Sequence, residues 1–516
     1  AVRGAIVSTA RRRRDGGTDA MTWSAMLARL EAEGLLVAHQ SADLEVRGVT
    51  HDSRAVVPGM VFVAVLGQKA DGAAFVADAR ARGAVAIMTE SPTGNDGIWA
   101  QVTDARRALA VAACATTGDP SVHLRVIGIT GTNGKTTTAH LVAAICDAAG
   151  TPSGIVGTLG YQAGQAVRST SHTTPEAPQL QAMLADMVAR GLGACAMEVS
   201  SHALALHRVA GTHFAAAVFT NLTRDHLDFH ADMERYFQAK RRLFEMLPSG
   251  APAVINLDDP RAHALAAVAT RAVTYGLAAN ADVTPVHVQM TLGGIQCEVQ
   301  CPDQRIAIAS ALVGRPNLYN ILAAVAVAWA LGIPATAIAA GIASVSHVPG
   351  RFEVVSGPSD DISVIVDYAH TDDALRNLLE TASALTTGRL VTVFGCGGDR
   401  DRSKRPLMGM VAGRLSDVVV LTSDNPRSEE PTRIIEDIER GITPDTRRQG
   451  LVLHVELERR EAIARAIGTA VPGDVILVAG KGHEQTQVIG TETRAFSDVA
   501  VAGEALAARR RLLGVA

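Results

Sequence analysis

The sequence predicts an α/β protein with three domains, built mainly from parallel sheets covered by helices. From residue 124 onward, short apolar runs alternate with helix-like stretches, which is typical of doubly wound sheets. The chain has 516 residues, enough for about three domains of ordinary size. Aromatic residues make up only 3% of the chain and glycine is abundant, which suits close packing of helices on sheets.

The composition argues against several classes of function. The net charge of −4 gives no overall basic field of the kind that nucleic-acid-binding proteins carry. No apolar run reaches the ~20 residues that a membrane-spanning helix needs, so no membrane insertion is expected. Cys297 and Cys301 lack a second pair of metal ligands, so buried thiols are favoured over a zinc site. Unpaired thiols indicate a reducing compartment, here the cytoplasm.

The first domain is expected over residues 21–121. Residues 1–20 carry four arginines at 11–14 and no apolar segment of the signal-peptide kind, so they are interpreted as a disordered basic tail. Strand-like runs at 60–67 and 84–90 flank a helix-like stretch. This pattern predicts a small N-terminal α/β domain.

The central domain is expected over residues 122–348. It opens on an almost wholly apolar run, as a buried parallel strand requires. The strands expected here lie at 124–130, 194–200, 215–222 and 251–258. Residues 284–310 alternate between apolar and polar side chains instead and are expected to form an antiparallel excursion. The pattern predicts a doubly wound domain.

A third, Rossmann-like domain is expected over residues 349–516, beginning where Pro349 and Gly350 end a helical pattern. Its strands are expected at 362–370, 389–398, 417–425 and 474–482. Each of these runs ends in a polar or glycine-rich loop. Because ligands of such sheets bind at the carboxyl ends of the strands, these loops are candidate binding loops.

A glycine-rich loop follows the first strand of the central domain. The segment GITGTNGKTTT (128–138) leaves that strand and opens a helix. Backbone amides of such a loop, together with the helix N-terminus, attract phosphate. Lys135 suits the β- and γ-phosphates and the Thr136 hydroxyl suits Mg²⁺. Ile129 stands where the strict Walker pattern has glycine, so the segment is interpreted as a variant phosphate loop of an ATPase domain.

Three further residues are candidates for the chemistry of phosphate transfer. Glu198 ends an apolar strand and suits Mg²⁺, although an N-capping role shared with neighbouring serines is an alternative. His226 follows another strand and is either a metal ligand or a loop residue. Lys240 lies in an amphipathic stretch, 232–247, beside Arg241 and Arg242. Its composition alone favours a solvated lysine.

A series of motifs resembles the Mur ligase superfamily of ATP-dependent amide-forming ligases and is closest to its MurE type. The motifs are DSR (52–54), GTNGKTT (131–137), TTP (173–175), MEVSSHAL (197–204), NLTRDHLDFH (221–230), GRPNLYN (314–320), VPGRFE (348–353), DYAH (367–370), GCGGDRD (395–401), DNPR (424–427) and GKGHE (480–484). They occur in order and span nearly the whole chain after residue 40. The resemblance implies a first domain that holds the UDP end of a substrate, a central ATP-binding domain and a third domain that brings an amino acid.

The resemblance also implies the residues of the ATP site. Residues matching the ATP-binding positions are Gly131, Thr132, Asn133, Gly134, Lys135, Thr136, Thr137, Asn317, Asn320, Arg351, Asp367 and His370. Lys240 matches a lysine that the family carbamylates with CO₂, giving N6-carboxylysine. A carbamate is an anionic oxygen ligand, so two Mg²⁺ ions are implied, held by Thr136, Glu198, His226 and carbamylated Lys240. The neutral amine that carbamylation needs requires a lowered pKa, to which Arg241 and Arg242 are expected to contribute. Lys135, Lys240, His226 and Glu198 are the implied catalytic residues.

Two substrate sites follow from the same resemblance. Positions matching the UDP-dipeptide site are His51, Ser53, Gln68, Lys69, Ala70, His172, Thr173, Thr174, Ser200, Leu206 and Arg208. His172 and Leu206 stand where the family often has Asn and Gln. Positions matching the diaminopimelate site are Arg400, Asp424, Asn425, Pro426, Arg427, Gly480 and Glu484. A guanidinium fork suits the distal carboxylate of diaminopimelate, which lysine lacks.

The implied activity is the ATP-dependent addition of meso-2,6-diaminopimelate to UDP-N-acetylmuramoyl-L-alanyl-D-glutamate through an acyl phosphate. This reaction belongs to peptidoglycan precursor synthesis, and a monomeric enzyme is expected. Alternatives are a lysine-adding enzyme or another Mur or folyl-polyglutamate-type ligase. A phosphate-loop ATPase that acts as a switch is an alternative of a different class. A switch protein has no reason to pair a metal-side lysine with several amino-acid-pocket loops.

Overall fold

The computed structural model describes residues 21–67, 70–91 and 97–514, which form two compact units. The first unit comprises the described residues up to His123 together with Glu176–Val188 and Leu206–Thr212, and the second unit comprises the rest. The basic tail, Gln68 and Lys69 lie outside the described residues. The three domain ranges expected above stay a prediction.

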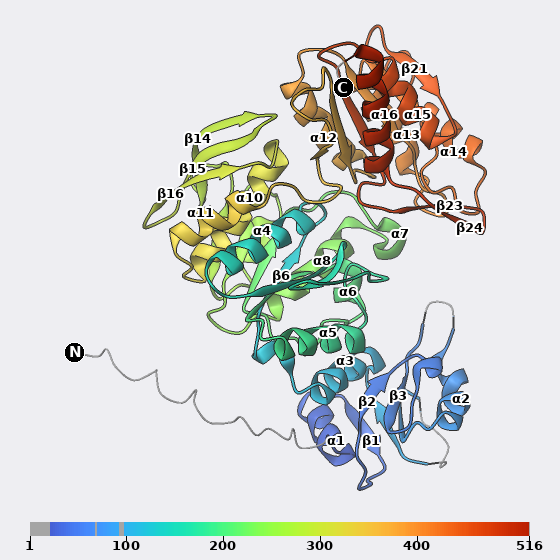
Figure 1. Ribbon diagram of the computed structural model, residues 1–516. Coiled ribbons are helices and arrows are strands. Elements are labelled where there is room, and N and C mark those ends of the chain that lie inside the picture. Colours follow the sequence, from blue (N-terminus) through green and yellow to red (C-terminus); the bar gives the residue numbers. More distant parts are fainter. Residues whose placement is uncertain (1–20, 68–69, 92–96, 515–516) are drawn as a thin grey trace. The chain divides into compact units, whose positions relative to one another are not determined.

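The first unit is built on a five-stranded sheet of order β1-β5-β4-β3-β2 (Figure 1). Its strands are β1 (Leu36–His39), β2 (Gly48–Thr50), β3 (Met60–Ala64), β4 (Ala86–Thr89) and β5 (Trp99–Val102). All neighbouring pairs are parallel except β1 with β5. The helices are α1 (Trp23–Ala32), α2 (Val76–Ala81) and α3 (Ala105–Thr116), with most of α5 (Ala177–Ala189) added from the later segment. Residues of α1 and α3 form one apolar core with the sheet, and Ala79 of α2 belongs to a smaller core that includes Phe62 of β3.

The second unit contains an eight-stranded sheet of order β13-β12-β11-β6-β10-β7-β8-β9. Its strands are β6 (Arg125–Thr130), β7 (Ser153–Gly157), β8 (Gly160–Ala163), β9 (Ala166–Arg168), β10 (Ala194–Glu198), β11 (Ala216–Phe219), β12 (Ala253–Asn256) and β13 (Ala272–Tyr275). The strands from β13 to β7 are parallel, and β8 and β9 continue the sheet as antiparallel strands. Strand β6 lies inside the sheet and is buried along almost its whole length, as its apolar sequence predicts.

Helices cover this sheet on both faces (Figure 1). The helices are α4 (Lys135–Ala148), α6 (Ser201–Ala205), α7 (Leu227–His230), α8 (Met233–Glu245), α9 (Ala262–Ala266), α10 (Arg315–Ala330) and α11 (Ala335–Ser344). Residues of α4, α10 and α11 share one continuous apolar core with the sheet. On α8, Leu243 approaches β6 so closely that a Cβ on Gly128 would meet it at 3.0 Å. The predicted antiparallel excursion at 284–310 is confirmed as β14 (Thr284–Thr291), β15 (Gly294–Gln300) and β16 (Arg305–Ser310).

A six-stranded sheet of order β17-β18-β22-β19-β20-β21 forms the rest of the second unit. Its strands are β17 (Glu353–Val354), β18 (Ser363–Asp367), β19 (Leu390–Phe394), β20 (Val418–Leu421), β21 (Val452–Val455) and β22 (Val475–Ala479), and β23 (Thr486–Ile489) pairs with β24 (Glu492–Ala495) in a separate hairpin. The sheet is parallel apart from β17. One core contains residues of α12 (Asp372–Leu385), α13 (Lys404–Leu415) and α14 (Pro431–Glu439), and a second contains residues of α15 (Arg459–Gly468) and α16 (Asp498–Leu513). The α/β fold with doubly wound parallel sheets is therefore confirmed.

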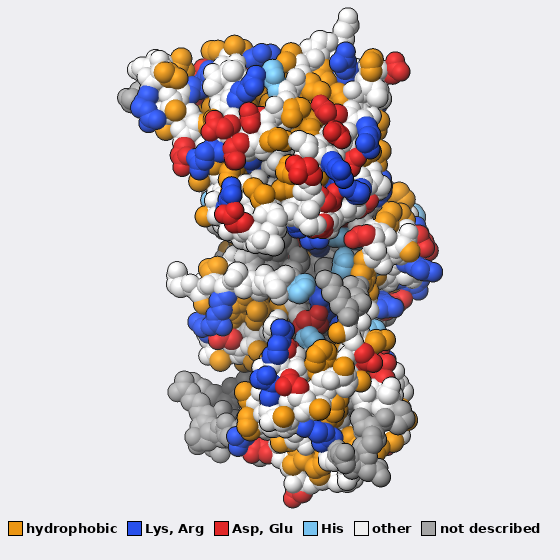
Figure 2. Space-filling view, turned by 90° about the vertical axis from the view of Figure 1, so that its right-hand side faces the viewer, with side chains coloured by type: hydrophobic (Ala, Val, Ile, Leu, Met, Phe, Trp, Pro, Cys, Tyr) orange, Lys and Arg blue, Asp and Glu red, His pale blue; other side chains and the backbone are white. Residues whose placement is uncertain are grey.

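The surface agrees with the near-neutral composition. Figure 2 shows acidic and basic side chains interspersed over the face it presents. In the described part of the chain, no helix is both long enough and apolar enough to cross a membrane.

Candidate functional site

The phosphate loop joins β6 to α4, and close contacts fix its shape. Gly131 and Gly134 both have positive φ, and a Cβ at Gly134 would overlap the side chain of Asn320. The backbone N–H of Asn133 donates to Asn221 Oδ1 at 2.9 Å, and its carbonyl accepts from Thr220 Oγ1 at 2.6 Å. The loop after β11 therefore holds the phosphate loop in place before any ligand arrives.

Lys135 folds back over this loop. Its Nζ donates to the carbonyls of Gly131 and Thr132, each at 2.9 Å. Burial lowers the pKa of Lys135, while the nearby Glu198 carboxylate opposes that shift. The Lys135 ammonium thus lies against the phosphate loop. If a polyphosphate bound there, its oxygens would take the place of the two carbonyls as acceptors for the ammonium.

Glu198 ends β10, next to β6 in the sheet, and its side chain is buried. Glu198 Oε2 accepts from Thr136 Oγ1 at 3.1 Å and from Thr158 Oγ1 at 3.1 Å. The capping role considered for Glu198 and the serines beside it is filled by Ser200, whose Oγ accepts a hydrogen bond from the backbone N–H of Ala203 at 3.2 Å. Glu198 therefore points towards the phosphate loop and its Thr136 hydroxyl, a pair of oxygens that suits a hard cation.

Lys240 is buried, with only 1% of its surface exposed, so the expectation of a solvated lysine is wrong. Its Nζ donates to the carbonyl of Gly131 at 2.8 Å and lies 4.4 Å from the centroid of the Tyr236 ring. Among the described residues, no carboxylate forms an ion pair with it. Burial, assisted by the cation of Lys135, lowers the pKa of Lys240 well below its ordinary value.

The cations expected to assist at Lys240 lie elsewhere. Arg241 pairs with Glu245 at 2.9 Å, and Arg242 donates to the carbonyl of Leu204 at 3.3 Å. Neither contributes to the lowered pKa of Lys240, so that expectation is wrong. The reason is helical geometry, because residues next to each other in sequence point in different directions around a helix.

His226 follows β11 in a left-handed conformation, with φ 53°. Its Nε2 lies 3.3 Å from Asp225 Oδ2, and burial lowers the pKa of His226 to about 4. A neutral imidazole of this kind is a suitable metal ligand. No group of three or more His, Cys, Asp or Glu side chains in the described ranges is arranged to hold a metal ion. The predicted set Thr136, Glu198, His226 and carbamylated Lys240 stays a prediction.

Asn317 and Asn320, two of the predicted ATP-binding residues, lie on α10 beside the phosphate loop. Asn320 Nδ2 donates to Asn317 Oδ1 at 3.0 Å, and Asn320 Oδ1 accepts from Thr138 Oγ1 at 3.4 Å. Asn317 Nδ2 donates to the carbonyl of Val313 at 2.8 Å. The two amides therefore form a buried chain that reaches the start of α4.

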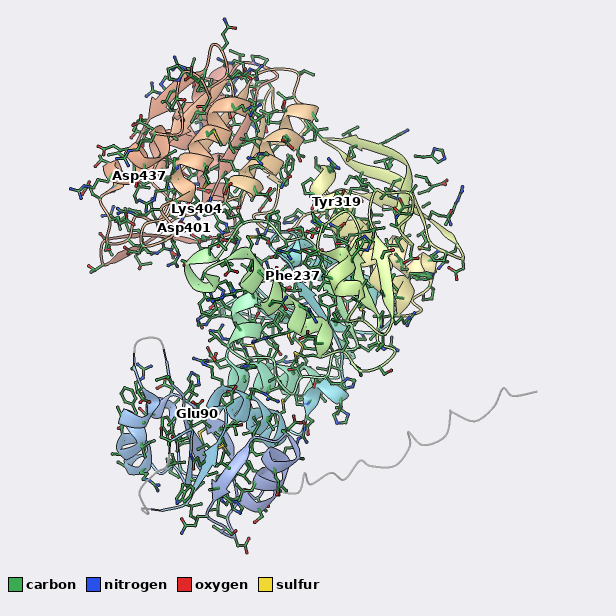
Figure 3. All side chains as sticks on the ribbon, turned by 180° about the vertical axis from the view of Figure 1, so that it is seen from behind. Glu90, Phe237, Tyr319, Asp401, Lys404 and Asp437 are labelled. Carbon is green, nitrogen blue, oxygen red and sulfur yellow. The ribbon has the colours of Figure 1, made fainter. Side chains whose placement is uncertain are left out.

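The DYAH (367–370) and PGRF (349–352) segments lie at the carboxyl end of β18 in the six-stranded sheet, and Arg351 contacts the helix that follows the phosphate loop. Arg351 Nη2 donates to Thr136 Oγ1 at 3.1 Å, and its guanidinium lies 4.7 Å from the Tyr368 ring centroid. Burial raises the pKa of Asp367, which accepts from the backbone of Phe352 at 2.7 Å. Lys404 donates to the carbonyl of His370 at 2.7 Å. Figure 3 shows Lys404 beside Asp401 at the start of α13.

The residues expected to bind the UDP-dipeptide occur in both units. In the first unit, Arg208 is buried and pairs with Glu176 at 2.7 Å, and burial lowers the pKa of His51. Ser53 begins a short 3-10 helix capped by Asp52, and Ala70 is exposed.

The UDP-dipeptide positions in the second unit lie around the end of β10. Thr174 Oγ1 donates to the carbonyl of Glu198 at 2.8 Å, and Ser200 donates back to Thr174 from its backbone at 3.0 Å. Thr173 contacts Thr158 at 3.1 Å. Of the two departures from the family pattern, His172 in this unit is exposed and Leu206 in the first unit is half-buried.

The diaminopimelate positions come together at the carboxyl ends of β19, β20 and β22. Arg427 has a left-handed backbone, φ 52°, and pairs in a β-bridge with Ile489. Its Nη1 donates to the carbonyl of Gly398 at 2.7 Å. Burial lowers the pKa of Arg427, and the neighbouring cation of Arg400 contributes. Two guanidinium groups thus lie near each other in the cluster of Arg400, Asp424, Asn425, Arg427 and Glu484, which we call the predicted amino-acid pocket.

Acidic side chains lie in the same pocket. Asp424 is buried, and a Cβ at Gly480 would come within 2.6 Å of its carboxylate, which explains the need for glycine there. Asn425 Nδ2 donates to Glu484 Oε2 at 2.8 Å. Pro426 lies between Asn425 and Arg427, and its carbonyl would overlap a Cβ at Gly398. The pocket therefore presents both positive and negative groups, as a zwitterionic ligand requires.

Sequence reasoning passed over several residues that the structure brings to these sites. Lys481 is fully buried and contacts both Asn425 and Glu484. Arg405 is fully buried and bridges Glu429 and Asp437 beneath the same loops. Lys481 was detectable, since it lies directly after an apolar strand within a motif already singled out. Arg405 lies in a helix whose pattern gives no comparable signal.

Known protein families match three successive segments of the chain. Sequence families described as the Mur ligase middle domain, the Mur ligase glutamate ligase domain and the Mur ligase family catalytic domain match residues 129–328, 350–482 and 45–122. A UDP-N-acetylmuramoyl-L-alanyl-D-glutamate--2,6-diaminopimelate ligase of Solibacter usitatus is 49% identical over 91% of this chain and 95% of its own. The ligase of the same name from Gloeobacter violaceus is 47% identical, again over 91% and 95%.

A solved structure of a ligase with that name superposes with a TM-score of 0.67 at 34% identity, covering 93% of this chain and 99% of its own. The relatives are similar along nearly their full length. The chain belongs to the Mur ligase family.

Proposed function

We propose that the chain is an ATP-dependent amide ligase that adds meso-2,6-diaminopimelate to UDP-N-acetylmuramoyl-L-alanyl-D-glutamate, in cytoplasmic peptidoglycan precursor synthesis. The observation that carries this proposal is the pocket after β19, β20 and β22. It places the guanidinium groups of Arg400 and Arg427 with the carboxylates of Asp424 and Glu484. The distal end of diaminopimelate carries one carboxylate and one ammonium, and this pocket offers a partner to each. The names of the relatives support the same substrate.

The first chemical step transfers the γ-phosphoryl group of ATP to the free D-glutamyl carboxylate. A carboxylate is a poor acyl donor because its leaving group would be oxide, and the acyl phosphate replaces oxide with phosphate. The phosphate loop and Lys135 hold and neutralise the phosphates, and Arg351 reaches the same loop through Thr136. In this proposal Asn317 and Asn320 contact the adenine.

Lys240 meets the requirement for carbamylation. Its amine attacks CO₂, forms an N–C bond and releases one proton, which requires the neutral form that burial favours. Thr136 and Glu198 would hold one Mg²⁺, and His226 with the Lys240 carbamate a second, so that the cations neutralise charge on the transferring phosphoryl group.

In the second step the amine of diaminopimelate attacks the acyl phosphate. The tetrahedral intermediate then loses phosphate and the new amide remains. The pocket residues orient the amino acid by its far end, so that its reacting amine is directed towards the acyl phosphate. Exclusion of water matters here, because the acyl phosphate hydrolyses readily.

The test is phosphate release with ATP, the UDP-dipeptide and either diaminopimelate or L-lysine, with product identity checked by mass spectrometry. We expect release that requires both the UDP-dipeptide and diaminopimelate, and little release with lysine. Lysine lacks the distal carboxylate and leaves Arg400 and Arg427 without that anionic partner. Release from ATP alone would support a switch ATPase instead, and equal rates with both amino acids would contradict the assigned specificity.

A further inference from the structure

Lys481 is a fully buried lysine whose role nothing above has assigned. It follows β22 in the GKGHE segment, and its side chain has no exposed surface. Its Nζ donates to Asn425 Oδ1 at 3.1 Å and to Glu484 Oε2 at 2.9 Å. Asn425 Nδ2 donates to the same Glu484 oxygen at 2.8 Å. The three side chains therefore form a closed triangle.

The triangle joins two loops that the sheet keeps apart. Asn425 follows β20, whereas Lys481 and Glu484 follow β22, and β19 lies between these strands. Asn425 Oδ1 also accepts from the backbone of Val488 at 3.0 Å, just beyond the second loop. No backbone hydrogen bond of the sheet directly connects β20 with β22. The side-chain triangle connects these loops, in addition to the β-bridge between Arg427 and Ile489.

Glu484 is the part of the triangle that solvent can reach. Its side chain is 31% exposed, while Asn425 and Lys481 are buried. Both donors of the triangle bind Oε2, so the carboxylate is anchored through one oxygen and presents the other. An exposed glutamate without such anchoring would sample several rotamers and lose that freedom when it binds a ligand. Anchoring removes this loss in advance, which is preorganisation.

We propose that Lys481 is a positioning residue for the amino-acid substrate. It fixes the Glu484 carboxylate in the orientation that accepts an ammonium and ties that carboxylate to the loop that carries Arg427. The inference rests on the proposed function, because it assigns Glu484 to the amino-acid pocket. Lys481 touches no substrate in this account and acts entirely through Glu484 and Asn425.

The test is a double-mutant cycle of Lys481→Met and Glu484→Gln, measured by steady-state kinetics with diaminopimelate. Loss of a hydrogen bond to a charged group predicts that Lys481→Met raises the KM for diaminopimelate about tenfold. The KM values for ATP and the UDP-dipeptide should change less than about twofold, because no hydrogen bond of the triangle goes to a described residue predicted to bind either of them. If Lys481 acts through Glu484, the double variant should have a KM no higher than that of Glu484→Gln alone.

Arg509→Met is the matched control. Arg509 is buried in the same sheet domain and pairs with Asp361 at 2.7 Å, with further bonds to the carbonyls of Ile467 and Ala470. These partners precede β18 and β22 and so lie at the opposite end of the strands from the pocket. The control removes a buried, paired cation and should leave the KM for diaminopimelate unchanged. Lys481→Ala also removes the hydrogen-bond donor and serves if Lys481→Met does not fold.

Three results would overturn the inference. They are an unchanged KM for diaminopimelate in the Lys481 variants, an additive effect in the double variant, and an equal rise in KM in Arg509→Met. Failure of the proposed function is a separate outcome, because the unsubstituted chain would then form no product with diaminopimelate.

Discussion

Two buried lysines of the second unit, Lys240 and Lys481, have opposite surroundings. Lys240 donates to a carbonyl of the phosphate loop and lies over the ring of Tyr236. Lys481 forms an ion pair with Glu484 at 2.9 Å and a hydrogen bond with Asn425. Both side chains are almost completely removed from water.

The two environments favour different states of the lysine side chain, a neutral amine for Lys240 and a paired ammonium for Lys481. Burial without a carboxylate partner favours the neutral amine, and a neutral amine is a nucleophile. Burial beside a carboxylate uses the charge to hold two side chains in place. A buried lysine can therefore be suited either to reaction or to holding a substrate-binding side chain in place. The groups around its ammonium decide between the two.

The largest effect is expected for Lys240→Met, which removes the amine proposed above to form the carbamate. Product formation should fall by about a thousandfold or more, because a ligand of the phosphoryl-transfer site is lost. ATP binding, followed by fluorescence or calorimetry, should stay within about threefold, since Lys135 and the loop are intact. In Lys240→Ala, whose shorter side chain leaves space, added acetate supplies a carboxylate and should restore part of the activity.

If Lys240→Met kept nearly the activity of the unsubstituted chain, the proposed carbamylation of Lys240 would be wrong. Removal of CO₂ and bicarbonate from the unsubstituted enzyme should lower its activity as well. Removal of CO₂ and bicarbonate should not change the activity of Lys240→Met, because this variant has no amine to carbamylate. It is therefore the matched control.

Arg427→Ala probes the pocket that Lys481 supports. Loss of a bidentate partner for the distal carboxylate should reduce kcat/KM for diaminopimelate by about a hundredfold. Use of L-lysine, which lacks that carboxylate, should change little, so the two substrates become more alike. Arg433→Ala, an exposed arginine on α14, is the control and should leave both values unchanged. Weakened ATP binding in Arg427→Ala would show that the pocket is assigned to the wrong ligand.

The two lysines also show what the sequence can predict. The phosphate loop is contiguous, so its glycines, Lys135 and Thr136 are recognisable without the fold. The burial of Lys240 was missed because Arg241 and Arg242 suggested a solvated face. A closer look at spacing finds Tyr236 four residues before it and Phe244 four residues after it, on the same helical stripe. Glu484 lies three residues after Lys481 in the same loop, but Asn425 follows a strand that is not adjacent to β22, and no local pattern predicts that second contact.

Thermal unfolding should distinguish the same two lysines by stability. Lys240→Met replaces a buried amine that has no carboxylate partner with an apolar side chain of similar size, so the unfolding temperature should stay the same or rise. Lys481→Met removes one of the donors to Glu484 and one of the donors to Asn425, and should cost about 2 kcal/mol. Differential scanning calorimetry of both variants measures this contrast. A larger loss in Lys240→Met than in Lys481→Met would contradict the assignment of partners.

The smallest effect concerns Glu429, which pairs with the buried Arg405 at 2.8 Å beneath the pocket loops. This ion pair is the largest cause that lowers the pKa of Glu429, to about 2. In the unfolded chain a glutamate titrates near its ordinary value of about 4.3. Because the folded pKa is the lower one, the stabilisation is complete above about pH 4.3 and is lost as the pH falls towards 2. Glu429→Gln should therefore lower stability by about 1 kcal/mol at pH 7 and make little difference near pH 2, measured as unfolding temperature across that range.

Glu504→Gln, which removes an exposed partner of Arg460, should show no such pH dependence. A difference between Glu429→Gln and the unsubstituted chain that persists unchanged to pH 2 would mean that shape, rather than charge, is what Glu429 contributes to these loops.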